Sequence, residues 1–216
     1  MLLFGDRITP EIIIALAAIL LVALPFHEFS HALAAFRQGD PTAKFLGRLT
    51  LNPLAHLDPI GAILIVLVGF GWAKPTPYNP LNLRNGKVGE AIIAAAGPLS
   101  NLVLAVAAAI PLRYIGATDM DVPPLVERAL VIFITLNVIL MIFNLVPIPP
   151  LDGSKVLFAA MDRRTEMQVR PMLEQYGFLI LIAAMFLPIF PGGDTVIRVI
   201  LREVGFPLVD FLIGPV

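Results

Sequence analysis

The chain has 216 residues, of which 58% are hydrophobic and only 14% are charged. Soluble globular proteins carry about 25% charged residues, so this composition excludes an ordinary soluble domain and predicts an all-α polytopic membrane protein. The formal net charge of −1 gives no reason to expect a nucleic-acid partner. The chain has no cysteine, so any metal site must be built from histidine and carboxylate side chains.

The first predicted helix runs from about Pro10 to Phe36. No charged residue lies between Glu11 and Glu28, and the apolar run between them is typical of a membrane helix. Pro25 lies inside this helix. A proline removes one backbone hydrogen bond, so a kink and a freed carbonyl are expected there.

The sequence His-Glu-Phe-Ser-His, residues 27–31, lies near the end of this helix. Residues four apart share one face of an α-helix, so His27 and His31 can bind one metal ion together. Glu28 then lies beside the ion, where its carboxylate can take a proton from an activated water. The alternative is a chance match whose histidines only satisfy hydrogen bonds. Ionisable residues are rare in membrane helices and mark functional sites there, which favours a metal site.

A short apolar segment, Ile60–Phe70, follows a polar loop. About 20 residues are needed to cross a bilayer as a helix, so this segment is predicted to enter the membrane and return on the same side. A tilted and stretched span is the alternative. Residues 73–80 contain three prolines and are predicted to be extended, because they cannot form a helix.

Three further membrane helices are predicted at Val88–Ile110, Leu125–Leu145 and Met172–Phe190. Charged or polar loops are expected to follow the first of these helices, at Arg113–Pro124, and to precede the last, at Asp162–Arg170.

The amphipathic segment at residues 194–214 either lies along the membrane interface or forms another span. The expected architecture is therefore about five to six membrane helices with a re-entrant or extended segment near residues 60–80. All of residues 1–216 are expected to form one membrane-embedded domain.

A catalytic zinc site needs a third protein ligand and one open position. The candidates in this sequence are Asp152, His56, Asp58 and Glu90. Asp152 is favoured because it follows a membrane-length helix in a proline-broken segment. If residues 60–70 re-enter, Asp152 emerges on the same side as the two histidines.

The same topology gathers ten of the 15 basic residues on the side of the histidines, which the positive-inside rule makes cytoplasmic. These ten are Arg37, Lys44, Arg48, Lys74, Arg84, Lys87, Lys155, Arg163, Arg164 and Arg170.

Four stretches of the chain carry a family resemblance. They are Phe-His-Glu-Phe-Ser-His at 26–31, the proline-rich region at 71–80, Ala-Gly-Pro-Leu-Ser-Asn at 96–101, and Asn-Leu-Val-Pro-Ile-Pro-Pro-Leu-Asp-Gly at 144–153. Together they resemble the site-2 protease family of intramembrane zinc metalloproteases, peptidase family M50. The chain resembles a compact branch of it, without PDZ or CBS domains. Ser30 departs from the pattern, because glycine is frequent at that position in the family.

The resemblance implies one zinc ion per chain, with His27, His31 and Asp152 as its ligands and Glu28 as the general base. It also implies a role for Asn144 near the substrate carbonyl. A substrate-pairing strand is implied at Lys74, Pro75, Thr76, Pro77, Tyr78 and Asn79. His56 and Asn101 are candidates for groups that support the ligands from behind, although a His56 that only bonds the local backbone is an equal alternative.

The implied function is hydrolysis of peptide bonds within or near transmembrane segments of membrane-protein substrates, as in regulated intramembrane proteolysis. The protein is expected to be a multi-pass protein of the cell membrane with its active site toward the cytoplasm, and its partners are the bilayer and transmembrane-helix substrates. A metal transporter is one alternative, disfavoured by the single ligand cluster and the lack of an inverted repeat. A non-catalytic binder of membrane helices is the other, disfavoured by the intact Glu28. Oligomeric state is not predicted.

Overall fold

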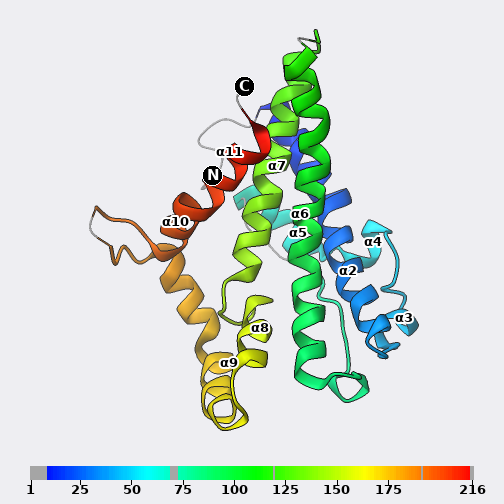
Figure 1. The fold of residues 1–216 in the computed structure, drawn as a ribbon, viewed down its shortest axis with the longest axis vertical. Helices are drawn as coiled ribbons and strands as arrows, with labels where there is room; N and C mark the ends of the chain where they lie inside the picture. The colour runs from blue at the N-terminus through cyan, green and yellow to red at the C-terminus, as the bar shows by residue number, and fades with distance from the viewer. Residues whose placement is uncertain (1–8, 69–72, 119, 191, 215–216) are drawn as a thin grey trace.

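The computed structural model describes residues 9–68, 73–118, 120–190 and 192–214, and these residues form helices and loops with one isolated β-bridge (Figure 1). The prediction of an all-α membrane protein is confirmed for this part of the chain. Four of its helices are long and apolar enough to cross a membrane. These are the helix Pro10–Arg37, α6 (Gly86–Thr118), α7 (Pro124–Leu145) and α9 (Arg163–Phe186).

The first helix is continuous but changes its winding before Pro25. It consists of α1 (Pro10–Ala18), a π-helical turn at Ile19–Ala23, and α2 (Leu24–Arg37). Pro25 has no N–H to donate to the preceding turn, and the π-turn lies directly before it. The winding therefore changes directly ahead of Pro25 and the two histidines, while the kink and the freed carbonyl at Pro25 stay predictions.

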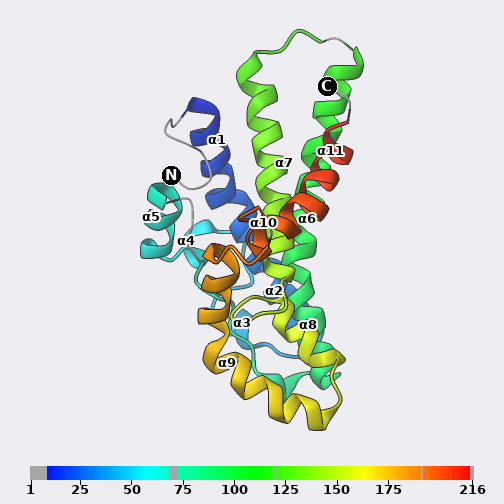
Figure 2. The ribbon, with the colours of Figure 1, turned by 90° about the vertical axis from the view of Figure 1, so that its left-hand side faces the viewer.

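The described residues between α2 and α6 form three short α-helices and one 3-10 turn. They are α3 (Thr42–Phe45), α4 (Pro53–His56), α5 (Pro59–Val68) and the 3-10 turn Pro80–Asn82. Residues 74–79 between them are extended, as the prolines predict. Leu57 forms an antiparallel bridge with Ala73, and the N–H of Lys74 donates to the carbonyl of His56 at 2.8 Å. The chain on either side of α5 therefore meets at one place, next to α4 (Figure 2).

α6 and α7 run antiparallel and form the centre of the bundle (Figures 1 and 2). α6 continues to Thr118, so the loop predicted from Arg113 is wrong over its first six residues. Pro111 lies inside the helix and does not end it, because one proline removes only one hydrogen bond. The last turns are held because Leu112 is buried and Arg113 donates to backbone carbonyls of the C-terminal helix.

α9 begins at Arg163, so the charged loop predicted at 162–170 is also wrong. Asp162 caps the helix by accepting hydrogen bonds from two backbone N–H groups of its first turn. Arg170 pairs with Glu166 at 3.2 Å and with Glu174 at 2.9 Å, both at the four-residue spacing that suits a helix. The charges belong to a helix that extends beyond its apolar part.

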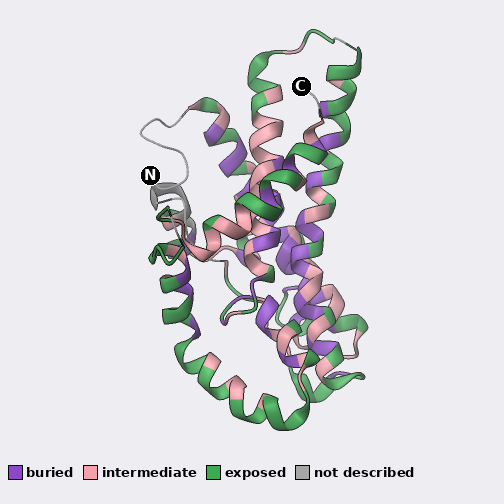
Figure 3. Ribbon diagram, turned by 60° about the vertical axis from the view of Figure 1, so that its left-hand side comes forward, coloured by how far each residue is buried: buried purple, intermediate pink, exposed green. Residues whose placement is uncertain are grey.

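The C-terminal helix comprises α10 (Val196–Ile200), a π-turn (Leu201–Gly205) and α11 (Phe206–Ile213). Val209 and Leu212 of α11 are buried in a core that α6 and α7 also supply. Figure 3 shows buried residues along the centre of the bundle and exposed ones on its outer faces. Within the described residues this helix and α5 fall outside the four candidate spans, which is why fewer spans are found than the five to six predicted.

Candidate metal centre

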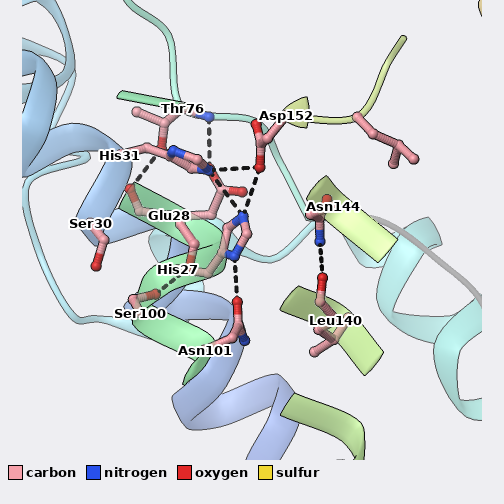
Figure 4. A network of polar contacts seen from close by, with 12 residues as sticks. His27, Glu28, Ser30, His31, Thr76, Ser100, Asn101, Leu140, Asn144 and Asp152 are labelled. Carbon is pink, nitrogen blue, oxygen red and sulfur yellow. Dashed lines mark hydrogen bonds and ion pairs between the residues drawn. The ribbon is translucent and has the colours of Figure 1, made fainter. Parts of the chain in front are cut away.

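Three side chains from two distant parts of the chain converge in the lower half of the bundle. The Nε2 atoms of His27 and His31 lie 2.9 Å apart. Oδ2 of Asp152 lies 3.3 Å from the first and 3.2 Å from the second (Figure 4). The two histidines are buried on α2, and Asp152 immediately precedes α8 (Gly153–Ala160). The structure therefore brings together the three residues expected to bind zinc.

The hydrogen bonds at the far side of each ring determine what faces the centre. Nδ1 of His31 lies 2.7 Å from the carbonyl oxygen of Ile93, and Nδ1 of His27 lies 2.6 Å from Oδ1 of Asn101. Both oxygens accept, so both Nδ1 atoms carry the proton and both Nε2 atoms present lone pairs. Two lone pairs and a carboxylate directed at one point repel one another unless a cation lies between them.

The donor set fits zinc. Imidazole nitrogen and carboxylate oxygen are zinc ligands, and bonds of about 2.0–2.1 Å in a tetrahedral site separate two ligand atoms by roughly 3.3 Å. The separations between His27, His31 and Asp152 are close to that spacing. Three protein ligands leave a fourth position for water or substrate, as in catalytic rather than structural sites.

Gly97 of α6 makes room for the centre. A Cβ atom at this position would lie 2.3 Å from Nε2 of His31 and 2.5 Å from Nε2 of His27. Any other residue would place a Cβ atom against the two nitrogens that are expected to bind the metal. The Ala-Gly-Pro-Leu-Ser-Asn motif therefore contributes a glycine that lets α6 pass the centre and, one turn later, the asparagine that bonds His27.

Glu28 is buried beside the histidines and is held by the extended segment. Its Oε2 accepts hydrogen bonds from the N–H of Thr76 at 2.8 Å and from the Thr76 hydroxyl at 2.7 Å. The carboxylate oxygen and the two imidazoles all lie within 4.8 Å of one another. Thr76 thus fixes the carboxylate beside the two imidazoles.

The extended segment 74–79 is hydrogen-bonded at both ends. Lys74 donates to the carbonyl of His56, and Asn79 donates to the carboxylate of Asp40. The buried Asp40 carboxylate accepts from the N–H of Asn79 at 2.7 Å, from Nδ2 of Asn82 at 2.8 Å and from the hydroxyl of Thr42 at 2.6 Å. Burial alone would raise the pKa of Asp40, but these hydrogen bonds outweigh it and hold the pKa below its ordinary value. The carboxylate is therefore ionised at neutral pH and fixes the segment to the end of the first helix.

Tyr78, also in this segment, packs near the centre. Burial and the neighbouring Glu90 raise its pKa to about 12, so the phenol is neutral. Lys155 of α8 lies 5.4 Å above its ring and 3.8 Å from Oδ1 of Asp152. The oxygen of Asp152 that does not face the histidines is thus oriented by a cation.

Glycine also permits the turn that delivers Asp152. A Cβ on Gly153 would lie 2.1 Å from the carbonyl oxygen of Leu145. The first turn of α8 therefore packs directly on the last turn of α7, and the proline-containing loop between them returns Asp152 to the bundle. This close contact is the physical reason for glycine after the aspartate in the Leu-Asp-Gly sequence.

Of the remaining expected site residues, Asn101 contacts the histidine cluster, whereas Asn144 and His56 bond to backbone carbonyls. Asn144 lies in the last turn of α7, and its Nδ2 donates to the carbonyl of Leu140 at 2.9 Å, away from the histidines (Figure 4). His56 is fully buried, and its Nε2 bonds the carbonyl of Thr50 at 2.7 Å, which matches the alternative of a histidine that bonds local backbone. Asn101 bonds His27, one of the three expected ligands.

Comparison with known proteins agrees with this geometry. The model of "Peptidase family M50" matches residues 122–188, the region of α7 to α9 that includes Asp152. The "Putative zinc metalloprotease YwhC" of Bacillus subtilis is 38% identical over 174 residues, which cover 79% of each chain. The chain belongs to peptidase family M50. The "Putative zinc metalloprotease Rip2" of Mycolicibacterium smegmatis is 33% identical over 176 residues, or 78% of this chain and 65% of Rip2.

The Rip2 protein of Mycobacterium tuberculosis is 29% identical over 181 residues, covering 80% of this chain and 66% of Rip2. The chain thus spans slightly less than two thirds of both Rip2 proteins. No solved structure matches the chain. The family predicted from the four motifs is confirmed, and with the buried cluster of His27, Glu28 and His31 so is its class, a zinc metalloprotease.

Three contributors to the centre were not predicted from the sequence: Thr76 as a partner of Glu28, Ile93 as the acceptor for His31, and Lys155 beside Asp152. A backbone carbonyl has no sequence signature. The threonine had one weak signal, since it is the single aliphatic hydroxyl in a proline-rich segment already expected at the active site.

Proposed function

We propose that this chain hydrolyses peptide bonds within or close to the transmembrane segments of membrane-protein substrates. One observation carries the proposal: two histidines and an aspartate converge on one point, with Glu28 beside them, inside a bundle of membrane-length helices. The helices that surround the centre restrict access from water, so a membrane-embedded segment is the substrate best placed to reach it.

The residues have separate roles. His27, His31 and Asp152 would hold the zinc ion, which supplies Lewis acidity for the attack of water on a carbonyl. Glu28 accepts the proton of the attacking water and passes it to the leaving amine. Its hydrogen bonds from Thr76 keep the carboxylate in place between the two transfers.

Substrate binding is assigned to residues 74–79. Neighbouring residues of an extended chain direct their N–H and C=O groups to opposite sides. The N–H groups of Lys74 and Thr76 donate into the protein, so the intervening Pro75 and the following Pro77 present carbonyls to the other side. Prolines have no N–H to leave unpaired there. An unwound substrate could pair with this edge by donating its own N–H groups.

The membrane topology is part of the proposal. The bridge between Leu57 and Ala73 supports re-entry of residues 60–70, because a chain that enters and leaves at one place returns to the side where it began. Re-entry puts the ten basic residues on the side of the metal centre, which supports a cytoplasmic active site in the cell membrane. If α5 and the C-terminal helix also lie in the membrane, they would add to the four candidate spans and give the five to six membrane helices expected for one metalloprotease domain.

The test uses the full chain in proteoliposomes with a single-pass membrane protein as substrate, and it follows cleavage and zinc uptake in parallel. The proposal expects cleavage by the wild type, none by Glu28→Gln, and no uptake by either. Zinc uptake without cleavage would contradict the proposed protease function and indicate a metal transporter. Substrate capture without cleavage by zinc-loaded wild type would instead indicate a non-catalytic binder.

A further inference from the structure

The two zinc-binding histidines are held by acceptors of different kinds. His31 donates from Nδ1 to the carbonyl oxygen of Ile93 in the backbone of α6. A backbone carbonyl can only accept, so this ring has one possible tautomer. His27 donates instead to the side-chain amide of Asn101. An amide that turned over would present its NH₂ group, and His27 would then have to carry its proton on Nε2, where the metal binds.

A second asparagine determines which way the first amide faces. Nδ2 of Asn101 donates to Oδ1 of Asn137 on α7 at 3.1 Å. Nδ2 of Asn137 in turn donates to the carbonyl oxygen of Phe133 at 2.9 Å. That carbonyl belongs to the backbone of α7 and cannot donate, so it fixes the orientation of Asn137. The carbonyl of Phe133 thus fixes the Asn137 amide, which in turn fixes the Asn101 amide, so that hydrogen bonds are donated in one direction, from His27 through both amides to Phe133.

The burial of these residues makes the chain of hydrogen bonds strict. Asn101 and Asn137 both have 0% exposure, so water does not replace a lost partner. Turning Asn137 over would place its oxygen against the carbonyl of Phe133 and its NH₂ against that of Asn101. Both contacts would be repulsive, and since both asparagines are fully buried, water would not compensate for the lost hydrogen bonds.

We propose that Asn137 is a positioning residue of the metal centre. Acting through Asn101, it holds His27 in the tautomer with the proton on Nδ1 and the lone pair on Nε2. This role rests on the proposed zinc centre and extends it to a residue on α7 that contacts none of the ligands. Asn137 thereby couples the packing of α6 against α7 to the affinity of the centre for zinc.

Zinc affinity of the purified full chain, measured by competition with a chelator, tests the proposal without any substrate. Asn137→Leu is expected to weaken binding about tenfold, since partners of ligating histidines contribute about 10–100-fold. Asn137→Ser is expected to do the same. Its hydroxyl can bond the Phe133 carbonyl and satisfy the helix, but it is too short to reach Asn101.

Ile134→Ala is the matched control. Ile134 is also fully buried on α7, one turn earlier, and its truncation loosens the same core without touching the amides. It should lower the melting temperature and leave zinc affinity within about twofold of the wild type. If this variant lost zinc as strongly as Asn137→Leu at a similar melting temperature, Asn137 would be only a packing residue and the proposal would fail.

A double-mutant cycle tests the route through Asn101. If Asn137 acts through it, Asn101→Ala combined with Asn137→Leu should weaken zinc binding no more than Asn101→Ala alone. Multiplied effects would overturn the proposal.

Nitrogen NMR of labelled histidine in the zinc-free protein gives a separate readout. Wild-type His27 should carry its proton on Nδ1, and Asn137→Leu should show a mixture of both tautomers. A pure Nδ1 tautomer in the variant would also overturn the proposal. A wild type that binds no zinc would instead contradict the proposed function. The tautomer of His27 is measured in the zinc-free protein, so that result would still test the role of Asn137.

Discussion

Gly97→Ala is expected to abolish zinc binding while leaving the helix around it intact. The added Cβ would lie 2.3 Å from Nε2 of His31 and 2.5 Å from Nε2 of His27. Ordinary contact requires about 3.5 Å, so both nitrogens would have to move by about 1 Å. Metal sites tolerate errors of about 0.2 Å in ligand distance, so a displacement of about 1 Å is several times too large.

The helix itself should gain from the substitution. Alanine is favoured over glycine in a helix interior by about 0.8–1.0 kcal/mol, so α6 is not weakened by the change. The strain of fitting a methyl into a filled site costs about 1–3 kcal/mol. The net effect on folding is therefore about 0–2 kcal/mol, while zinc affinity should fall by at least about a hundredfold because two of three ligands are displaced.

The assay is metal analysis of the purified chain, followed by chelator competition, circular dichroism and a melting curve. Gly116→Ala is the control, since it lies in the same helix and a Cβ there meets nothing within 4 Å. It should keep one zinc per chain. If Gly97→Ala also kept zinc at wild-type affinity, the position assigned to the metal between the histidines and α6 would be wrong.

Four further results are expected. Glu28→Gln should abolish cleavage and leave zinc in place, which metal analysis of the inactive protein checks. Thr76→Val should lower kcat about tenfold with little change in KM, and Thr76→Ser should restore it, because the hydroxyl orients Glu28. Asn144→Ala should lower kcat about a hundredfold if its amide meets the developing charge, whereas a lower melting temperature at normal kcat would assign it to helix packing. Asp40 has a lowered pKa in the folded state, so its contribution to stability is complete well above its ordinary value of 3.8 and is lost as pH falls through the lower folded value. The difference in melting temperature between wild type and Asp40→Asn should therefore be constant near neutral pH and shrink below about pH 4.

Local spacing in the sequence was sufficient to predict the first half of the metal centre. A four-residue separation on an apolar helix already determines that His27 and His31 share a face, and α2 has this form. Asp152 needed a different kind of inference, because it is 121 residues after His31. Its predicted place depended on the direction in which each helix runs, and in the structure it lies beside the histidines. Re-entry of residues 60–70 stays a prediction, which α5 and the paired ends of the segment support.

The errors arose where a residue type was given more weight than its surroundings. The helix predicted to end at Ile110 continues to Thr118, because tertiary contacts hold its last turns. The charges at 162–170 were assigned to a loop, although Asp162 is a strong N-cap and the charges form pairs along a helix. Thr76 and Asn137 were missed as partners in the centre because each contact joins two elements, and a single sequence does not specify such pairs.

One physical constraint accounts for the form of the whole centre. Inside a membrane protein an unpaired polar group costs several kcal/mol, so each polar group brought to the metal needs its own partner. His31 donates a hydrogen bond to a backbone carbonyl of α6, and Glu28 accepts hydrogen bonds from Thr76. His27 is linked through two side-chain amides to a backbone carbonyl of α7. These backbone carbonyls already serve their helices and can accept a second hydrogen bond.

The same constraint applies to the substrate. A transmembrane helix that unwinds for cleavage exposes N–H groups that neither lipid nor the metal ligands can satisfy. In the proposed binding mode, the carbonyls of Pro75 and Pro77 would face the substrate from a segment that is fixed to Glu28 and Asp40, and a proline has no N–H group of its own to leave unpaired there. A substrate strand paired there would replace the hydrogen bonds it lost on unwinding, beside the base that acts on it. Unwinding and catalysis would then use one segment, residues 74–79, so that a substrate gains its backbone partners only where it can be cut.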